Sequence, residues 1–279
     1  MTPIAPAPTT ASHPGIRLIL TDVDGTILPA DRDEVSPACV EAFHAALEAG
    51  IHVGAASGRG ATRVPQVFGG DKACCRTLLA ANGMQVYLDD ELVHETHIDR
   101  DALLAIADVT RGMEGCGLIC FDGPQALVVT GRVEDLRKSF RIYAKTACAV
   151  SDVPEFHVFT PVNLERTQKV IEVLRREVPQ VDYSLPMPGF INTTPHGWSK
   201  ASAVDVLAER LGISLDQVVV FGDSGNDLEM LRHVPNSVAV ANATPEAKAA
   251  ARWHIGECAD DAVARAIAAI ARGEWPFTE

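Results

Sequence analysis

Two acidic residues, Asp22 and Asp24, stand one residue apart directly after a short apolar run at 17–20. In an extended chain, residues i and i+2 project to the same side, so these two carboxylates are expected to lie close together. They repel each other unless a proton or a cation intervenes. A hard divalent cation with oxygen ligands is the natural partner. The alternative is a solvated acidic turn, because Asp24-Gly25 is a common turn dipeptide.

A second acidic cluster, GDSGND at 222–227, follows another apolar run about two hundred residues later. Asp223 can complete the ligand set of the cation. Asp227 can bind the cation directly or orient a water bound to it, and Asn226 can donate to a phosphate oxygen. For Asp227 alone, an ordinary acid at the start of a helix is the competing interpretation.

Two further sites supply hydrogen-bond donors and positive charge. Ser57-Gly58 offers a hydroxyl and exposed backbone N–H groups suited to phosphate oxygens at a helix start. Taken alone, a Ser-Gly pair is more often only a turn. Lys200 begins a helix and would provide the fixed positive charge that a phosphoryl-transfer site needs beside its metal.

The elements that must position these residues are short apolar strands. Runs at 17–20, 51–56, 77–81 and 218–221 each end in a polar cluster. Helical segments with short loops separate the first three runs, which indicates a parallel sheet. Ligands of open parallel sheets bind outside the carboxyl ends of the strands, so the clusters are expected to converge. They are Asp22 with Asp24, Ser57, Asn82 and Asp223.

From residue 84 the alternation of strands and helices gives way to hairpins and helices, and it resumes near residue 192. The sequence therefore predicts an α/β protein whose doubly wound, Rossmann-like parallel sheet is interrupted by an inserted α+β cap domain. We expect the core at residues 15–83 and 192–279 and the insertion at 84–191. Residues 1–14 are rich in Pro, Ala and Thr and are expected to form a disordered tail.

The amino-acid composition limits the kinds of molecule that this protein is expected to bind. The net charge is −13, from 24 Lys+Arg against 37 Asp+Glu. A field of that sign repels nucleic acid and anionic membrane surfaces, so we expect a small-molecule partner. We find no signal peptide and no run near the roughly 18 apolar residues that span a bilayer, so we expect a cytoplasmic protein. The seven cysteines are interpreted as scattered reduced thiols. Nothing in the sequence indicates the oligomeric state.

At this point the residues resemble a known family. The segment LTDVDGT at 20–26 is similar to the nucleophile motif of the haloacid dehalogenase-like phosphatases. Ser57, Lys200 and the cluster at 222–227 fall where the other three motifs of that family stand. VAVANA at 238–243 and Asn82-Gly83 resemble the Cof-type subgroup. Two positions depart from the pattern of the subgroup. Ala201 stands where Gly is common, and Asn192 stands where an acidic residue is frequent.

The resemblance implies a Mg²⁺-dependent phosphatase that acts through a phospho-aspartate. Mg²⁺ would be held by the Asp22 carboxylate, the Asp24 backbone carbonyl and Asp223, with Asp227 as a further ligand or positioning group. Asp22 would attack phosphorus. Asp24 would begin protonated, protonate the leaving oxygen and then take a proton from the hydrolytic water. The transferring oxygens would be held by Ser57, Gly58, Lys200 and Asn226.

Several alternatives stay open. A phosphomutase would use the same pair of acids, and a receiver-like signalling protein or a non-catalytic metabolite-binding protein would share some of the residues. The substrate is a small phosphorylated metabolite, with sugar phosphates and phosphorylated cofactors both open. Arg59 either faces the substrate or forms a surface salt bridge. His94, Arg111 and Arg141 of the insertion have no spacing that assigns them a role.

Overall fold

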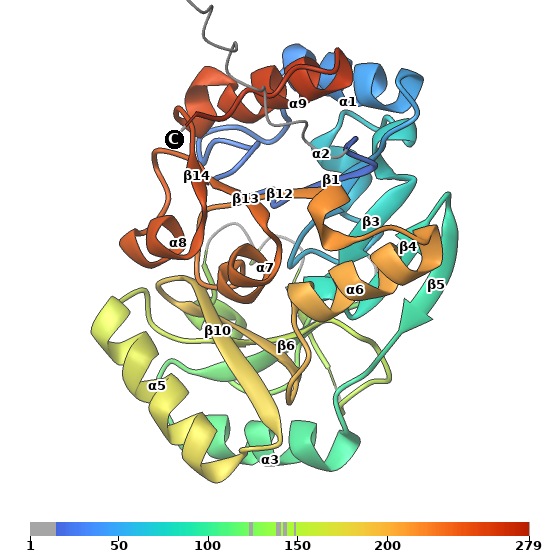
Figure 1. Cartoon of the computed structure of the whole chain (residues 1–279). Helices are drawn as coiled ribbons and strands as arrows, with labels where there is room; N and C mark the ends of the chain where they lie inside the picture. The colour runs from blue at the N-terminus through green and yellow to red at the C-terminus, as the bar shows by residue number, and fades with distance from the viewer. Residues whose placement is uncertain (1–14, 123–124, 138–140, 142–143, 148, 279) are drawn as a thin grey trace, which may run out of the picture.

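The computed structural model describes residues 15–122, 125–137, 141, 144–147 and 149–278; the predicted tail at 1–14 lies outside them. The described chain forms two sheets, each with its own helices (Figure 1). We call the part built on the eight-stranded sheet the first unit and the part built on the six-stranded sheet the second unit. No helix of the described residues is both long enough and apolar enough to cross a bilayer.

The sheet of the first unit has the strand order β14-β13-β12-β1-β2-β3-β4-β5. All neighbouring strands from β14 to β3 are parallel, whereas β4 and β5 are antiparallel additions at the β3 edge. Several of the central strands are buried along their whole length, which is why they appear in the sequence as continuous apolar runs. The strands are β1 (Leu18–Thr21), β2 (His52–Ala56), β3 (Thr77–Ala80), β4 (Gln85–Leu88), β5 (Glu91–Glu95), β12 (Val218–Gly222), β13 (Asn236–Ala239) and β14 (Trp253–His254).

Helices cover both faces of this sheet. In Figure 1, α1 (Pro37–Glu48) and α9 (Ala262–Ala271) lie above it, and α6 (Lys200–Leu211), α7 (Leu228–His233) and α8 (Pro245–Ala250) lie below it. The short helix α2 (Val64–Val67) follows β2. Ser36 caps the N-terminus of α1, since its hydroxyl accepts a hydrogen bond from the backbone N–H of Cys39.

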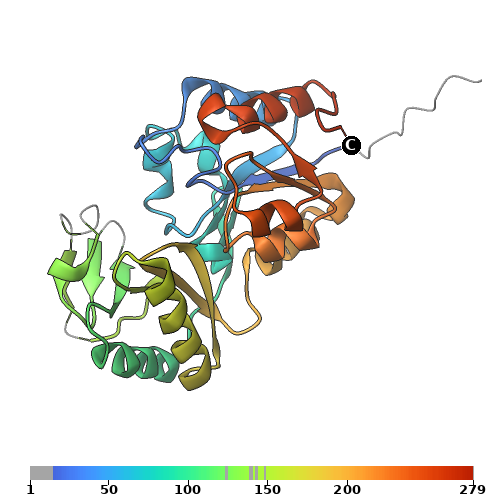
Figure 2. The same cartoon turned by 90° about the vertical axis from the view of Figure 1, so that its left-hand side faces the viewer.

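The sheet of the second unit has the order β10-β11-β9-β6-β7-β8. Helices α3 (Arg100–Arg111) and α5 (Leu164–Glu177) cover one of its faces, and Phe156 and Val158 pack beneath them. His157 alternates with these two along the strand, so it points to the other face. Figure 2 shows this unit beside the first. The strands are β6 (Gly117–Asp122), β7 (Gln125–Val128), β8 (Ala144–Thr146), β9 (Phe156–Phe159), β10 (Val181–Met187) and β11 (Phe190–Pro195).

The predicted fold class is confirmed, while the sheets change at other points than the predicted boundaries at 84 and 191. A hairpin of β4 and β5 follows residue 84, where hairpins were expected to begin, but β4 pairs with β3 through a tight turn and so extends the first sheet. At the other end, β11 runs on to Pro195 in the second sheet. The division into core and insertion stays a proposal, and sheet membership favours junctions after Glu95 and Pro195. The strands β8, β10, β11 and β14 were not predicted from the sequence.

Candidate active site

The first sheet reverses its strand order between β1 and β12. From β1 the chain runs outward through β2 and β3, and it returns after the second unit to place β12 on the other side of β1. Ligand sites of doubly wound sheets form at such a switch point. Asp22 directly follows β1 and Asp223 directly follows β12, so the topology itself brings these two acids together.

Lys200 lies between two buried carboxylates. Its Nζ donates to Asp22 Oδ1 at 2.6 Å and to Asp227 Oδ1 at 2.7 Å. Lys200 is 1 % exposed, Asp22 is 4 % exposed and Asp227 is fully buried. The other oxygen of Asp227 accepts from the backbone N–H groups of Asp223 and Ser224. Asp227 therefore holds the lysine and the 222–227 loop together, since both of its oxygens have protein donors.

Burial dominates the electrostatics of these acids. Burial raises the pKa of Asp22 well above its ordinary value, and the charges of Asp227 and Asp223 act in the same direction, against Lys200. Burial, with the charge of Asp227 next, raises the pKa of Asp223 to about 7. Burial alone would lower the pKa of Lys200, but Asp22 and Asp227 together raise it above its ordinary value. A cluster of acids whose pKa values are raised in this way favours the binding of an additional cation.

Asp223 approaches the turn after β1 closely. Its Oδ1 accepts a hydrogen bond from the Thr26 hydroxyl at 3.0 Å. Gly25 has a φ of +90°, and a Cβ at this position would lie 2.6 Å from Asp223 Oδ2. A side chain at residue 25 would therefore both strain the backbone and displace the acid.

Asp24 forms an ion pair with Arg59. Arg59 Nε donates to Asp24 Oδ2 at 2.9 Å, and Arg59 Nη2 donates to Asp24 Oδ1 at 2.6 Å. Arg59 thus forms the salt bridge that was one of its two predictions, and it also lines the cavity that contains Asp22, so the other prediction stays open. Both Asp24 oxygens have a cationic donor here, so Arg59 must move away before this carboxyl group can contact a ligand in the cavity.

The predicted phosphate-binding residues take different positions. Gly58 and Asn226 line the cavity that contains Asp22. Asn226 also donates from Nδ2 to Asn82 Oδ1 at 3.2 Å. Ser57 is 1 % exposed, and its hydroxyl accepts from the backbone N–H of Arg59. In this arrangement the Ser57 hydroxyl shapes the loop, and the adjacent Gly58 contacts the open space.

The cavity beside Asp22 has a volume of about 500 Å³ and is bounded by both units. Small-molecule sites commonly fall in this range of volume. Asp22, Asp24, Asn226 and residues of the loop after β1 line it from the first unit. The second unit contributes Arg137, His157, Pro186, Met187, Phe190 and Asn192. The cavity is therefore large enough for a whole metabolite as well as the phosphate group.

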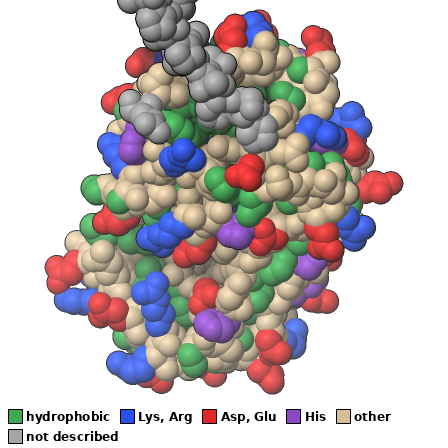
Figure 3. Space-filling view, viewed as in Figure 1, with side chains coloured by type: hydrophobic (Ala, Val, Ile, Leu, Met, Phe, Trp, Pro, Cys, Tyr) green, Lys and Arg blue, Asp and Glu red, His purple; other side chains and the backbone are tan. Residues whose placement is uncertain are grey.

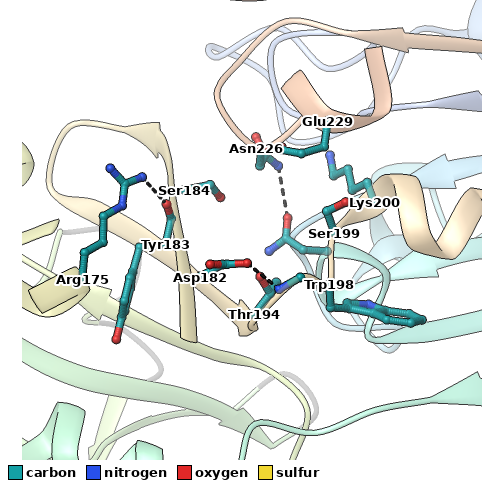
Figure 4. A pocket seen from close by; sticks show the side chains of 12 residues that line it. Arg175, Asp182, Tyr183, Ser184, Thr194, Trp198, Ser199, Lys200, Asn226 and Glu229 are labelled. Carbon is teal, nitrogen blue, oxygen red and sulfur yellow. Dashed lines mark hydrogen bonds between the residues drawn. The ribbon is translucent and has the colours of Figure 1, made fainter. Parts of the chain in front are cut away.

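A second cavity, of about 270 Å³, lies between α6, α7 and the β10–β11 hairpin. Figure 4 shows Lys200 and Asn226 on one side of it, with Arg175 and Tyr183 across from them. Asn226 lines both cavities, so this polar side chain separates the two spaces.

Three acids at the switch point fit a hard cation. Asp22, Asp223 and Asp227 each offer a carboxylate oxygen, and these oxygens lie within 4.8 Å of one another. Oxygen ligands at such spacing suit Mg²⁺ or Ca²⁺. Asp24 was predicted as a ligand through its backbone carbonyl, and the pairing of its side chain with Arg59 leaves that carbonyl for the role.

Sequence reasoning missed the residues that join the two units. Arg63, at the start of α2, donates to Glu155 and lies over the ring of Phe121. Glu155 is 2 % exposed and also contacts His157. The available signal was the spacing of Glu155, directly before β9, and His157 within it, because residues i and i+2 of an extended chain project to the same side.

The three side chains within residues 84–191 that the sequence left unassigned have local partners. His94 stacks on Trp198, Arg111 pairs with Asp108 and Arg141 donates to the Leu136 carbonyl. The six described cysteines are free thiols, and Cys148 lies outside the described residues.

Comparison with known proteins places the site in context. The family model of haloacid dehalogenase-like hydrolases matches residues 19–267. The protein YxeH of Bacillus subtilis is 28 % identical over 274 residues, covering 90 % of this chain and 97 % of that protein. A phosphoglycolate phosphatase of Pyrobaculum neutrophilum is 29 % identical over 243 residues, covering 85 % and 88 %. The solved structure of the phosphatase BT1666 from Bacteroides thetaiotaomicron has a TM-score of 0.75 at 20 % identity, covering 95 % and 97 %. The matched region runs from β1 into α9 and so spans both units.

Proposed function

Since the chain belongs to the haloacid dehalogenase-like hydrolase family and is a phosphoric monoester hydrolase, we propose that it releases phosphate from a small phosphorylated metabolite through a phospho-aspartate on Asp22. The observation that carries this proposal is the position of Lys200, which holds Asp22 at the edge of a metabolite-sized cavity. A buried ammonium fixes one oxygen of the carboxylate and leaves the other for the substrate.

Mg²⁺ is the cofactor we propose. The close carboxylate oxygens of Asp22, Asp223 and Asp227, and the raised pKa of Asp223 that burial causes, support a cation at this point. Asp22 and Asp223 would hold the ion with the Asp24 backbone carbonyl, while Asp227 would act mainly through Lys200 and the loop backbone. When bound, Mg²⁺ supplies the positive charge that lets an anionic nucleophile approach an anionic phosphate.

The first chemical step is attack by an Asp22 oxygen on phosphorus. A new O–P bond forms as the ester P–O bond breaks, and the leaving oxygen takes a proton from Asp24. Arg59 must first release Asp24, because the guanidinium occupies both oxygens in the present arrangement. The entering substrate phosphate is the anion that can compete with Asp24 for Arg59.

The second step regenerates the enzyme. Asp24, now a carboxylate, takes a proton from a water that attacks the phosphorus of the phospho-aspartate. The bond between phosphorus and the Asp22 oxygen breaks, and inorganic phosphate leaves. The transferring oxygens are held by the third N–H of Lys200, the amide of Asn226 and the backbone at Gly58, with Ser57 fixing the shape of that loop.

Hydrolysis of p-nitrophenyl phosphate with and without Mg²⁺ tests the proposal. The Asp22→Asn variant should keep its fold by circular dichroism and lose more than about 100-fold in kcat. Asp31→Asn, on the exposed part of the loop after β1, is the matched control and should retain wild-type turnover. Acid-quenched enzyme should carry phosphate on Asp22. Turnover of Asp22→Asn above a hundredth of wild type would reject Asp22 as the nucleophile.

The same preparation separates hydrolysis from phosphoryl transfer. A phosphatase releases inorganic phosphate in step with loss of a sugar phosphate. A phosphomutase returns the phosphoryl group, so an isomeric sugar phosphate would accumulate without free phosphate.

A further inference from the structure

The cavity beside Asp22 carries an unusual balance of charge. Charged side chains of both signs are interspersed on the face of the protein in Figure 3, and the whole chain has a net charge of −13. The residues that line this cavity nevertheless include four arginines against three aspartates. The arginines are Arg32, Arg59, Arg63 and Arg137, and the aspartates are Asp22, Asp24 and Asp33.

An ion pair or exposure to solvent accounts for the charge of three of the four arginines. Arg59 is paired with Asp24, and Arg63 is paired with Glu155. Arg32 is exposed to solvent, where salt screens its charge. These three leave Arg137 as the cavity arginine whose role the proposed reaction does not explain.

Arg137 has neutral acceptors. Its Nη1 donates to the Met187 thioether at 2.9 Å, and its Nη2 donates to the Pro188 carbonyl at 2.8 Å. Its Nε is buried and has no acceptor among the described residues. These contacts use two of the five N–H donors of a guanidinium and fix its orientation, but they bring no negative charge to it. A partly buried cation whose contacts with the described residues are all neutral is costly, and an anionic ligand would compensate it.

The surroundings of Arg137 suit the body of a small organic molecule. Pro186, Met187 and Phe190 line the same cavity from the second unit, and Asn192 adds a neutral amide. Apolar walls with one fixed charged donor orient a ligand by its polar end. Arg137 comes from the second unit and Asp22 from the first, so one ligand in this cavity can contact both.

We propose that the substrate carries a second anionic group, a carboxylate or a second phosphate, which Arg137 binds while the scissile phosphate faces Asp22. The inference rests on the proposed function and specifies its substrate class. The planar fork of a guanidinium matches both carboxylate and phosphate oxygens. A sugar phosphate with only hydroxyl groups at its other end would leave the charge of Arg137 uncompensated.

Matched pairs of substrates test this assignment. For the carboxylate, the pairs are 3-phosphoglycerate with glycerol 3-phosphate and 6-phosphogluconate with sorbitol 6-phosphate. For the second phosphate, the pair is fructose 1,6-bisphosphate with fructose 6-phosphate. In the wild-type enzyme, at least one charged member should exceed its neutral partner by about 10- to 100-fold in kcat/KM, as expected for a hydrogen bond between charged groups. The preferred pair identifies the anion.

Two variants assign the preference to Arg137. Arg137→Gln should lower the charged-to-neutral ratio of kcat/KM to near one, mainly by raising KM for the charged member, and Arg137→Lys should keep part of the ratio. Arg132→Gln is the matched control, because Arg132 lies on the same unit, is 72 % exposed and pairs with Asp135. It should leave the ratio unchanged. Melting curves verify that each variant is folded.

The inference is overturned if no charged member is preferred, or if Arg137→Gln keeps the wild-type ratio. Failure of the proposed function has a different signature, namely that the wild-type enzyme does not hydrolyse p-nitrophenyl phosphate. Calorimetry can measure the affinity of the charged probes for the Asp22→Asn variant, with and without Arg137→Gln. This comparison tests the Arg137 contact in the absence of turnover. Equal affinity in the two variants would contradict the assignment even if hydrolysis were observed.

Discussion

Lys200 Nζ lies 2.6 Å from Asp22 Oδ1, although 178 positions separate the two residues in the sequence. The lysine also contacts Asp227, so one ammonium compensates two buried carboxylates. This contact joins α6 to the end of β1, and both the stability and the chemistry of the site depend on it.

Replacement of Lys200 should therefore destabilise the whole protein. In Lys200→Met, Asp22 and Asp227 stay buried without a counter-charge, and the free energy of unfolding should fall by about 3–5 kcal/mol. Urea unfolding without Mg²⁺ measures the loss. Lys169→Met, which removes an exposed helix-surface partner of Glu165, should show no measurable change. A loss for Lys200→Met below about 1 kcal/mol would mean that the acids find another partner or a proton.

Replacement of Asp24 should separate the two chemical steps. p-Nitrophenolate is a good leaving group and needs little protonation, so Asp24→Asn should still form the phospho-aspartate. Its hydrolysis should slow by about 100-fold or more, because no carboxylate takes the proton from water. Stopped-flow measurement should therefore show a burst of p-nitrophenol close to the enzyme concentration. If the dephosphorylation step of Asp24→Asn matched that of wild type, Asp24 would not be the base.

The stabilisation by Mg²⁺ should depend on pH. Burial and Asp227 raise the pKa of Asp223 from its ordinary 3.8 to about 7 in the folded metal-free protein. A raised folded-state pKa means that proton uptake stabilises the fold; this contribution is complete below pH 3.8 and is lost as pH rises through about 7. Mg²⁺ needs the carboxylate, so its addition should raise Tm more at about pH 8 than at about pH 5.5.

Thermal melts with and without saturating MgCl₂ at the two pH values measure this effect. Asp223→Asn is the control, and Mg²⁺ should raise its Tm little at either pH. An equal Mg²⁺ shift at both pH values in the wild type would show that Asp223 does not hold the ion.

Replacement of Glu155 should weaken the junction between the two units. Glu155 is 2 % exposed and accepts from Arg63 across that junction. Glu155→Gln leaves the guanidinium with a neutral partner in a buried place, and the free energy of unfolding should fall by about 3 kcal/mol. KM should rise as well, since Arg63 lines the cavity. Asp135→Asn, which breaks the pair with exposed Arg132, is the control on the same unit. An unchanged free energy of unfolding in Glu155→Gln would mean that the contact between Glu155 and Arg63 does not stabilise the protein.

Much of the first unit could be predicted from the sequence because its strands are buried on both faces. Such strands appear as continuous apolar runs, and the polar residues after them mark their carboxyl ends. Parallel pairing then places Asp22 beside Asp223 without any knowledge of the helices. The burial of Lys200 was harder to predict, since a lysine side chain is usually solvated. The packing of α6 nevertheless leaves it only 1 % exposed.

The cavity wall of the second unit could not be predicted in the same way. Its sheet pairs strands that are far apart in the sequence, such as β6 with β9 and β9 with β11. Which face of β9 meets the first unit depends on these pairings, so the spacing of Glu155 and His157 could not show that the two side chains face the first unit. Arg63 and Arg137 stand outside any regular strand, where hydrophobic periodicity carries no information. The hairpin β4–β5 was assigned to the insertion because local patterns do not show which sheet an edge strand joins.

The place of the second unit within the chain also sets the order in which the protein can be completed during synthesis. A nascent chain that ends at Pro195 contains Asp22 and both strands of the β10–β11 hairpin, but it lacks β12, Lys200 and Asp223. The strand β1 then has its neighbour β2 on one side and none on the other, and Asp22 has no ammonium beside it. On the ribosome, the second unit therefore emerges whole before the first can close around its own charged centre.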